Sequence, residues 1–190
     1  MSGTEKKLIH HSDQKLTFGS MTIVARDGVF TPDPTLSYST PMILENLPDV
    51  SGKTVLDLGT GTGIVAIRCA LDGASRVVAT DVSSLALKNV QENIEQNRIA
   101  DVVEIRASNL FEQVPESFDY IFANLPIKDD IWGEGVSPID TLRTFLSHVR
   151  SHLNDAGMAY FIWGLDVDYG PVLAALRTEG MFLNALIETR

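Results

Sequence analysis

From residue 53 onward, short apolar runs rich in β-branched residues alternate with longer segments whose apolar residues follow one stripe. The short runs predict strands and the longer segments predict helices. The expected strands are residues 54–58, 76–80, 102–106, 118–123, 158–163 and 181–187, and the expected helices are residues 63–71, 83–96, 138–152 and 171–178. This alternation predicts an α/β fold: a Rossmann-like, doubly wound, mostly parallel sheet with helices on both faces.

The chain ahead of this pattern has a different character. Residues 1–14 are polar, and the strand-like segments that follow, with a turn at residues 26–28, predict a small β-hairpin. Two prolines exclude a helix from the middle of residues 31–35, and residues 41–47 read as a short helix. The segment around residue 35 is either a simple connector or a loop that leans over a ligand cleft. We therefore expect an N-terminal tail and β-hairpin over residues 1–30 and a main domain over residues 31–190.

Composition narrows the class of protein. The chain has 190 residues, of which 44% are hydrophobic and 21% charged, as expected for one soluble domain. Its formal net charge of −10 argues against broad electrostatic binding to nucleic acid or to an anionic membrane. The single cysteine, Cys69, excludes an internal disulfide and fits a reducing compartment. No stretch approaches the ~20 apolar residues of a membrane span, so we expect a cytoplasmic protein.

Three glycines at alternate positions, Gly59, Gly61 and Gly63, lie between the expected strand 54–58 and the expected helix 63–71. Glycine permits a left-handed backbone and lets a ligand approach the main chain without meeting a Cβ. The first turn of a helix also leaves N–H groups unpaired, and ligands of open α/β sheets bind beyond the carboxyl ends of the strands. The stretch predicts a nucleotide-type cofactor site; the alternative is a turn that only packs helix on strand.

Two acidic residues indicate which cofactor this turn would hold. The glycine spacing is G-x-G-x-G rather than the dinucleotide G-x-G-x-x-G, and Asp57 precedes it. A carboxylate there disfavours a pyrophosphate but favours a cationic ligand such as a sulfonium amino acid. Asp81, after the second strand, can accept hydrogen bonds from both ribose hydroxyls. This pattern resembles the class I S-adenosylmethionine (SAM) methyltransferases, with a NAD site as the competing interpretation.

Two further loops follow strands at the same edge of the predicted sheet. Asn124-Leu125-Pro126-Ile127 comes directly after the strand 118–123, and an asparagine there can accept a hydrogen bond from a planar –NH₂ group. The alternative is a simple proline turn. Asn109 and Leu110 follow the strand 102–106, where they can meet an adenine ring or cap a helix.

The histidines offer the only pattern for a metal site. His10 and His11 are adjacent in the polar tail, and His148 and His152 have the four-residue spacing of two helical metal ligands. Neither pair has a third ligand or an intervening glutamate motif. We therefore predict no metal cofactor.

The motifs also carry a resemblance to known families. Residues 55–97, with VLDLGTGTGIVAI, DGASRVVATDVSSLAL and QENIEQN, resemble the bacterial ribosomal-protein lysine methyltransferases. FDYIFANLP, residues 118–126, resembles the small-domain N-methyltransferases, which include release-factor glutamine and rRNA guanine methyltransferases. The resemblance implies that the methionine part of SAM contacts Asp57, Gly59, Thr60, Gly61 and Gly63, and that the ribose contacts Asp81 and Val82. It further implies that the adenine contacts Asn109 and Leu110. The methyl acceptor would contact Asn124, Leu125, Pro126 and Ile127.

The sequence departs from these families at several points. Their usual Asn-Pro-Pro-Tyr motif ends in an aromatic residue that stacks on a planar acceptor, whereas Ile127 stands here. The chain also has room for one closing strand, residues 181–187, where the usual fold has a reversed pair, and no long recognition domain is evident.

The resemblance favours SAM-dependent N-methylation, which would leave S-adenosylhomocysteine as product. We expect a protein side chain as acceptor ahead of an RNA base or a small molecule, and no membrane partner. Alternatives are a non-catalytic SAM-binding subunit that works with a helper chain, or a NAD-dependent oxidoreductase. A homodimer is also possible.

Overall fold

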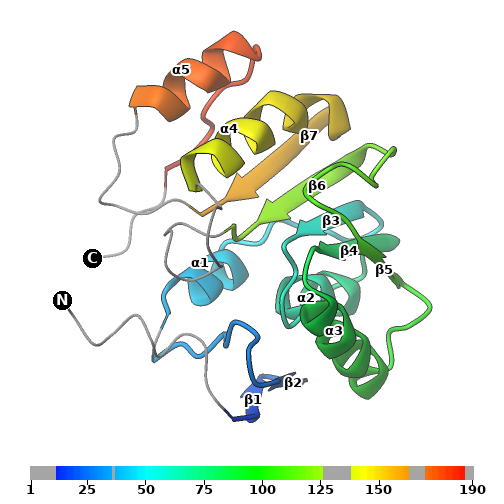
Figure 1. The fold of residues 1–190 in the computed structure, drawn as a ribbon. Coiled ribbons are helices and arrows are strands. Elements are labelled where there is room, and N and C mark those ends of the chain that lie inside the picture. The colour runs from blue at the N-terminus through cyan, green and yellow to red at the C-terminus, as the bar shows by residue number, and fades with distance from the viewer. Residues whose placement is uncertain (1–11, 36, 126–137, 163–169, 187–190) are drawn as a thin grey trace, which may run out of the picture.

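The computed structural model describes residues 12–35, 37–125, 138–162 and 170–186. Its central element is a five-stranded sheet in the order β5-β4-β3-β6-β7, and every neighbouring pair is parallel (Figure 1). The sheet strands are β3 (Thr54–Leu58), β4 (Arg76–Asp81), β5 (Val103–Ala107), β6 (Phe118–Ala123) and β7 (Leu153–Phe161). The helices are α1 (Ser39–Glu45), α2 (Ile64–Leu71), α3 (Ser84–Asn97), α4 (Pro138–Val149) and α5 (Gly170–Thr178), and a short 3-10 turn (Arg150–His152) follows α4.

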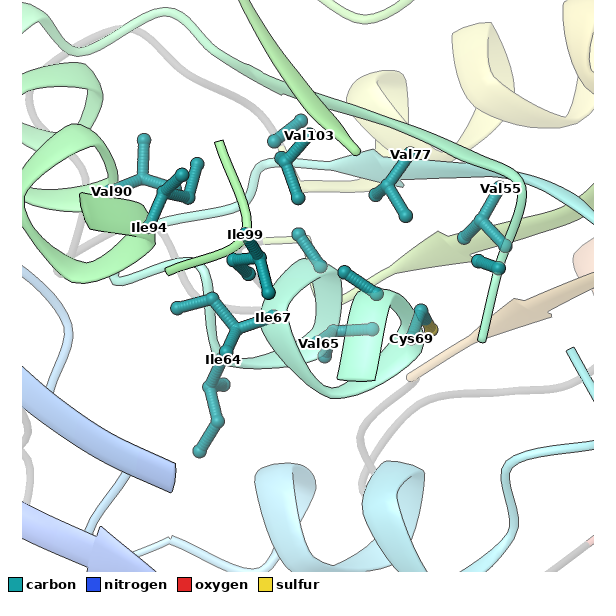
Figure 2. Packing of buried hydrophobic residues seen from close by; sticks show 14 of the residues in the cluster. Val55, Ile64, Val65, Ile67, Cys69, Val77, Val90, Ile94, Ile99 and Val103 are labelled. Carbon is teal, nitrogen blue, oxygen red and sulfur yellow. The ribbon is translucent and has the colours of Figure 1, made fainter. Parts of the chain in front are cut away.

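Helices cover both faces of this sheet, as the alternation of strands and helices predicts. Side chains of a strand point to opposite faces in turn, so Val55 and Leu56 of β3 enter two different cores. One core packs β3 and β4 against α1, α2 and α3, and Figure 2 shows Val55, Ile67, Val77 and Val90 within it. The other core packs the opposite face against α4 and α5. The predicted α/β fold class is confirmed.

A separate antiparallel hairpin, β1 (Gln14–Phe18) and β2 (Met21–Ala25), lies beside α3 (Figure 1). Its connection turns at Gly19, whose φ of 59° is left-handed. The structure thus corrects the prediction that the hairpin turns at residues 26–28. A turn does form there, but it follows β2 and is closed by the Val29 N–H donating to the Arg26 carbonyl at 3.0 Å. Met21 and Ile23 of β2 are buried in the same core as α2 and α3, so the hairpin is packed onto the main domain.

Several predicted boundaries differ from the structure by one or two residues, such as α1, which covers Ser39–Glu45 in place of the expected 41–47. Two larger differences in boundary and one wrongly predicted strand stand out. The last sheet strand begins at Leu153, ahead of the expected 158, and α4 ends at Val149 before the 3-10 turn. Residues 181–186 are not a strand, which corrects the expected strand 181–187 as far as the structure describes it. Phe182 is 93% exposed, so this apolar segment lacks the burial and the neighbouring strand that would favour an extended ladder.

Candidate functional site

The glycine turn leaves the carboxyl end of β3 and leads directly into α2. Gly59, Gly61 and Gly63 all have left-handed backbones, with φ of 69°, 54° and 82°. The Thr60 N–H donates to the Thr80 carbonyl of β4 at 2.8 Å, and the Gly63 N–H donates to the Thr60 carbonyl at 2.8 Å. These bonds fix the turn at the edge of the sheet where ligands of open α/β folds bind.

The glycines have different reasons to be glycine. A Cβ on Gly63 would lie 2.4 Å from Val90 Cγ2 of α3, so this position is required for packing. A Cβ on Gly59 would lie 3.5 Å from Leu125 Cδ2, an ordinary contact with the loop after β6. A Cβ on Gly61 would meet nothing within 4 Å. The space that a side chain of residue 61 would occupy is therefore open, as a close approach by a ligand requires.

Asp57, in the middle of the buried sheet, fastens this turn to α2. It is only 4% exposed, and its Oδ2 accepts from Thr60 Oγ1 at 2.7 Å and from the Ala66 N–H at 3.1 Å. The second bond caps the first turn of α2, which its own N-cap residue, Gly63, cannot do. Burial raises the pKa of Asp57 to about 6, and the negative charge of Asp81 contributes to the rise.

Asp81 ends β4 on the other side of the turn. Its Oδ2 accepts from the Gly61 N–H at 3.0 Å and its Oδ1 from the Ser83 N–H at 2.9 Å. Burial raises its pKa, although these backbone donors act in the opposite direction. Among the described residues neither Asp57 nor Asp81 forms an ion pair. Two carboxylates without a cation on either side of an open glycine turn suit a ligand that carries a positive centre and hydroxyl donors.

The loop after β6 meets the first residue of α1. Asn124 is half-buried, and its Nδ2 donates to Ser39 Oγ at 3.2 Å. Ser39 Oγ in turn lies 2.8 Å from Ser37 Oγ. This contact brings the start of α1 to the edge of the site, while a role of residues 31–35 as a loop over a ligand cleft stays a prediction. Leu125 packs beside Gly59, while Pro126 and Ile127 lie outside the described residues.

The loop after β5 is built around a buried serine that the sequence interpretation did not single out as a functional residue. Ser108 Oγ donates to the Leu110 carbonyl at 2.8 Å and accepts from the Gln113 N–H at 3.0 Å. Asn109 is exposed and its Nδ2 donates to Glu112 Oε1 at 2.9 Å. Residues 110–113 form a turn rather than a helix, so the alternative role of Asn109 as a helix cap is not what the structure shows. Leu110 has a φ of 47°, and Val82, near the same edge, is 71% exposed.

Two hydroxyl-bearing residues at this edge of the sheet, Ser39 and Thr80, were also not predicted as site residues from the sequence. Ser39 is distant from Asn124 in the chain, so only the fold reveals their contact. Thr80, just before Asp81, is 1% exposed and its hydroxyl has no hydrogen-bond partner among the described residues. The signal for Thr80 was its position at a strand end beside an acid.

The histidine and cysteine side chains have structural roles. His152 stacks on Phe111 with ring centroids 4.3 Å apart, and its Nδ1 lies 2.9 Å from the His148 carbonyl. Cys69 is buried in the core, and burial raises the pKa of its thiol, so it is not poised as a nucleophile. Within the described ranges no group of three or more His, Cys, Asp or Glu residues could hold a metal ion, and His10 and His11 lie outside them. No helix in these ranges is long and apolar enough to cross a membrane.

Comparison with known proteins places this geometry in a family. The profile of the methyltransferase small domain matches residues 20–182. A ribosomal protein L11 methyltransferase of Desulforamulus reducens is 39% identical over 112 residues, which cover 54% of this chain and 36% of that protein. A putative protein N5-glutamine methyltransferase of Methanocaldococcus jannaschii is 40% identical over 85 residues, 45% of this chain and 42% of that protein. The chain thus spans well under half the length of these curated relatives.

Solved structures give the same fold. A ribosomal protein L11 methylase from Lactobacillus delbrueckii subsp. bulgaricus matches with a TM-score of 0.64 and 27% identity, over 79% of this chain and 70% of that one. A 16S rRNA methyltransferase from T. thermophilus, solved with AdoMet and guanosine, matches with a TM-score of 0.70 and 23% identity over 85% of this chain and 44% of that one. The second likeness concerns the fold alone.

Proposed function

The chain belongs to the methyltransferase small-domain family, and on that premise we propose that it is a class I SAM-dependent methyltransferase. The observation that carries the proposal is a pair of carboxylates, the buried Asp57 and the half-buried Asp81, on either side of a turn that is open at Gly61. A NAD site would bring a pyrophosphate close to Asp57, where two anions would repel each other.

The residues present fit SAM, which supplies an electrophilic methyl group on a sulfonium sulfur. Asp81 would accept the ribose hydroxyls, and the charge of Asp57 would favour the cationic methionine part through the turn. Asn109 and Leu110 would meet the adenine, which requires Asn109 to exchange its bond to Glu112 for one to the ring. These roles convert a bimolecular transfer into one between aligned groups, and alignment is the larger part of the expected rate enhancement.

We propose a nitrogen of a protein side chain as the methyl acceptor. Supporting this choice, the relatives named above are a ribosomal-protein and a protein-glutamine methyltransferase, and the net charge of −10 opposes broad binding to RNA. Asn124 would orient the acceptor. Since its Nδ2 donates to Ser39, its Oδ1 is the atom that would accept from the acceptor N–H. Such a bond becomes stronger as the nitrogen gains positive charge during transfer.

The acceptor class can be tested by incubating the purified chain with tritium-labelled SAM and either extracted ribosomal proteins or ribosomal RNA. We expect label in the protein fraction, sensitive to protease. Label in RNA would overturn the protein acceptor. Intact SAM binding without label in either fraction would overturn independent catalysis and favour a SAM-binding subunit that needs a helper chain.

The role of Asn124 is tested by Asn124→Ala. We expect SAM affinity to stay within about threefold of wild type while methyl transfer falls about a hundredfold, as when one donor or acceptor at a reacting group is removed. The matched control is Asn154→Ala. Asn154 bonds Asp119 near the opposite ends of β6 and β7, so its loss should leave transfer unchanged. Equal transfer by wild type and Asn124→Ala would contradict the assignment.

A further inference from the structure

Three asparagines of α3 bind the backbone of the N-terminal hairpin. Asn89, Asn93 and Asn97 each accept a backbone N–H of β2 or the residue after it: from Arg26 at 3.0 Å, from Val24 at 2.9 Å and from Thr22 at 3.2 Å. They also donate back through Nδ2. Asn97 donates to the Thr22 carbonyl at 2.8 Å, while Asn89 and Asn93 donate to the Val24 carbonyl at 2.7 and 2.8 Å.

The spacing of these bonds follows from the geometry of the two elements. Four residues of an α-helix rise about 6.0 Å, and two residues of a β-strand rise about 6.6 Å, so the two periods nearly match. In an antiparallel pair, alternate residues direct N–H and C=O away from the partner strand. The asparagine amides therefore occupy the place of a third strand at the edge of β2 that faces away from β1. This accounts for docking of the hairpin but does not by itself concern the cofactor site.

Asn93 differs from the other two because it also reaches the glycine turn. Its Nδ2 donates to the Thr62 carbonyl at 2.9 Å, and both residues are buried, with 0% and 2% of their surface exposed. The remaining bond of Asn97 is instead to the Asn93 carbonyl within α3, at 2.7 Å. One buried amide thus joins the hairpin, the helix and the turn, and all three of its described bonds are within normal hydrogen-bond range.

We propose that Asn93 is a positioning residue of the cofactor site, through which docking of the hairpin holds the Thr62 carbonyl and raises the affinity for SAM. The proposal rests on the proposed function of the turn. Its physical basis is that the Thr62 peptide follows Gly61, whose N–H bonds Asp81. A turn fixed at Asp81 on one side and at Asn93 on the other presents its main chain in one arrangement, which reduces the entropy lost when a ligand orders it.

The test compares Asn93→Ala with Asn97→Ala, because both variants remove bonds to β2 but only the first removes the bond to Thr62. The measurements are SAM affinity by calorimetry and thermal unfolding without ligand. We expect both variants to lose stability, and SAM affinity to fall about tenfold in Asn93→Ala but less than about twofold in Asn97→Ala, given the strength of a buried hydrogen bond. Equal weakening in both, or in neither, would overturn the role of the Thr62 bond. A wild-type chain that does not bind SAM would overturn the proposed function instead.

A second measurement needs no substitution and covers the case in which Asn93→Ala fails to fold. Coupling between two sites is reciprocal, so the ligand should also strengthen docking of the hairpin. We would measure amide hydrogen exchange of the wild type with and without S-adenosylhomocysteine. The ligand should slow exchange of the Val24 N–H, and it should slow it more than it slows exchange of the Ala159 N–H in β7. Exchange at Val24 that is unchanged, or slowed no more than at Ala159, would overturn the coupling.

Discussion

Two groups of carboxylates on the same sheet have opposite electrostatic environments. Asp57 and Asp81 flank the glycine turn at the carboxyl ends of β3 and β4, and burial raises the pKa of each, that of Asp57 to about 6. Glu104 lies in β5 and Glu116 just before β6, and Arg76 and Arg106 each pair with both glutamates. The side-chain hydrogen bond from Arg106 is the main cause that lowers the pKa of Glu116 to about 2.

The difference separates charge that stabilises the fold from charge that is available to a ligand. A carboxylate whose folded pKa is lowered contributes stability above its unfolded pKa. A carboxylate whose folded pKa is raised does the opposite, because the folded chain disfavours its anion. Carboxylates whose pKa is raised by burial, with no cation beside them, are typical of functional sites. In the ion-pair cluster of Arg76, Glu104, Arg106 and Glu116, by contrast, each glutamate already has cationic partners.

The strongest test of this contrast removes the charge of Asp81. Asp81→Asn should weaken SAM binding about a hundredfold, since two charge-assisted hydrogen bonds to ribose hydroxyls would become weaker neutral ones. Titration calorimetry measures the change. The matched substitution in the ion-pair cluster, Glu104→Gln, should leave SAM affinity unaltered. Equal SAM affinities of the wild type and Asp81→Asn would contradict the distinction between the two groups of carboxylates.

A second test asks whether Asp57 lowers stability at neutral pH. Its folded pKa of about 6 exceeds the ordinary value of 3.8, so its effect on stability is absent below about pH 4 and complete above pH 6. Asp57→Asn should therefore raise the free energy of unfolding by as much as about 3 kcal/mol at neutral pH. The gain should vanish near pH 4, while SAM binding should weaken. Urea unfolding at both pH values decides this, and a variant less stable than wild type at neutral pH would contradict it.

The smallest expected effect concerns the ion-pair cluster. Because the folded pKa of Glu116 is lowered from 4.5 to about 2, its contribution is present above pH 4.5 and is lost as the pH falls through 2. Glu116→Gln should reduce the free energy of unfolding by about 1 kcal/mol at neutral pH, because its ion pairs are partly exposed to solvent. Added salt should shrink the loss. A loss that persists in high salt would indicate packing rather than charge.

Much of the fold was predictable because its signals are local. The strands 54–58 and 118–123 coincide with β3 and β6, since apolar runs between breakers define a buried parallel strand. Residues 181–186 are also mostly apolar, but residues 182–186 lie exposed, because strand propensity has effect only where a neighbouring strand and a covering layer exist. The division into residues 1–30 and 31–190 stays a prediction.

The site residues that lie at strand ends could be predicted from the sequence. The site contacts between residues far apart in the chain could not. Asp57, Asp81 and Asn124 lie at the same edge of the sheet, as expected when parallel strands end together. The bonds of Asn124 to Ser39 and of Asn93 to Thr62 join segments that no spacing rule relates. The individual roles of the predicted site residues remain proposals.

The turn at Gly61, between the carboxylates of Asp57 and Asp81, is the proposed binding site for SAM. The most direct measurement is calorimetric titration of the purified chain with SAM and S-adenosylhomocysteine, with NAD as the control. We predict micromolar binding of both SAM and its product, and none of NAD. Binding of NAD together with no detectable binding of SAM would contradict this assignment.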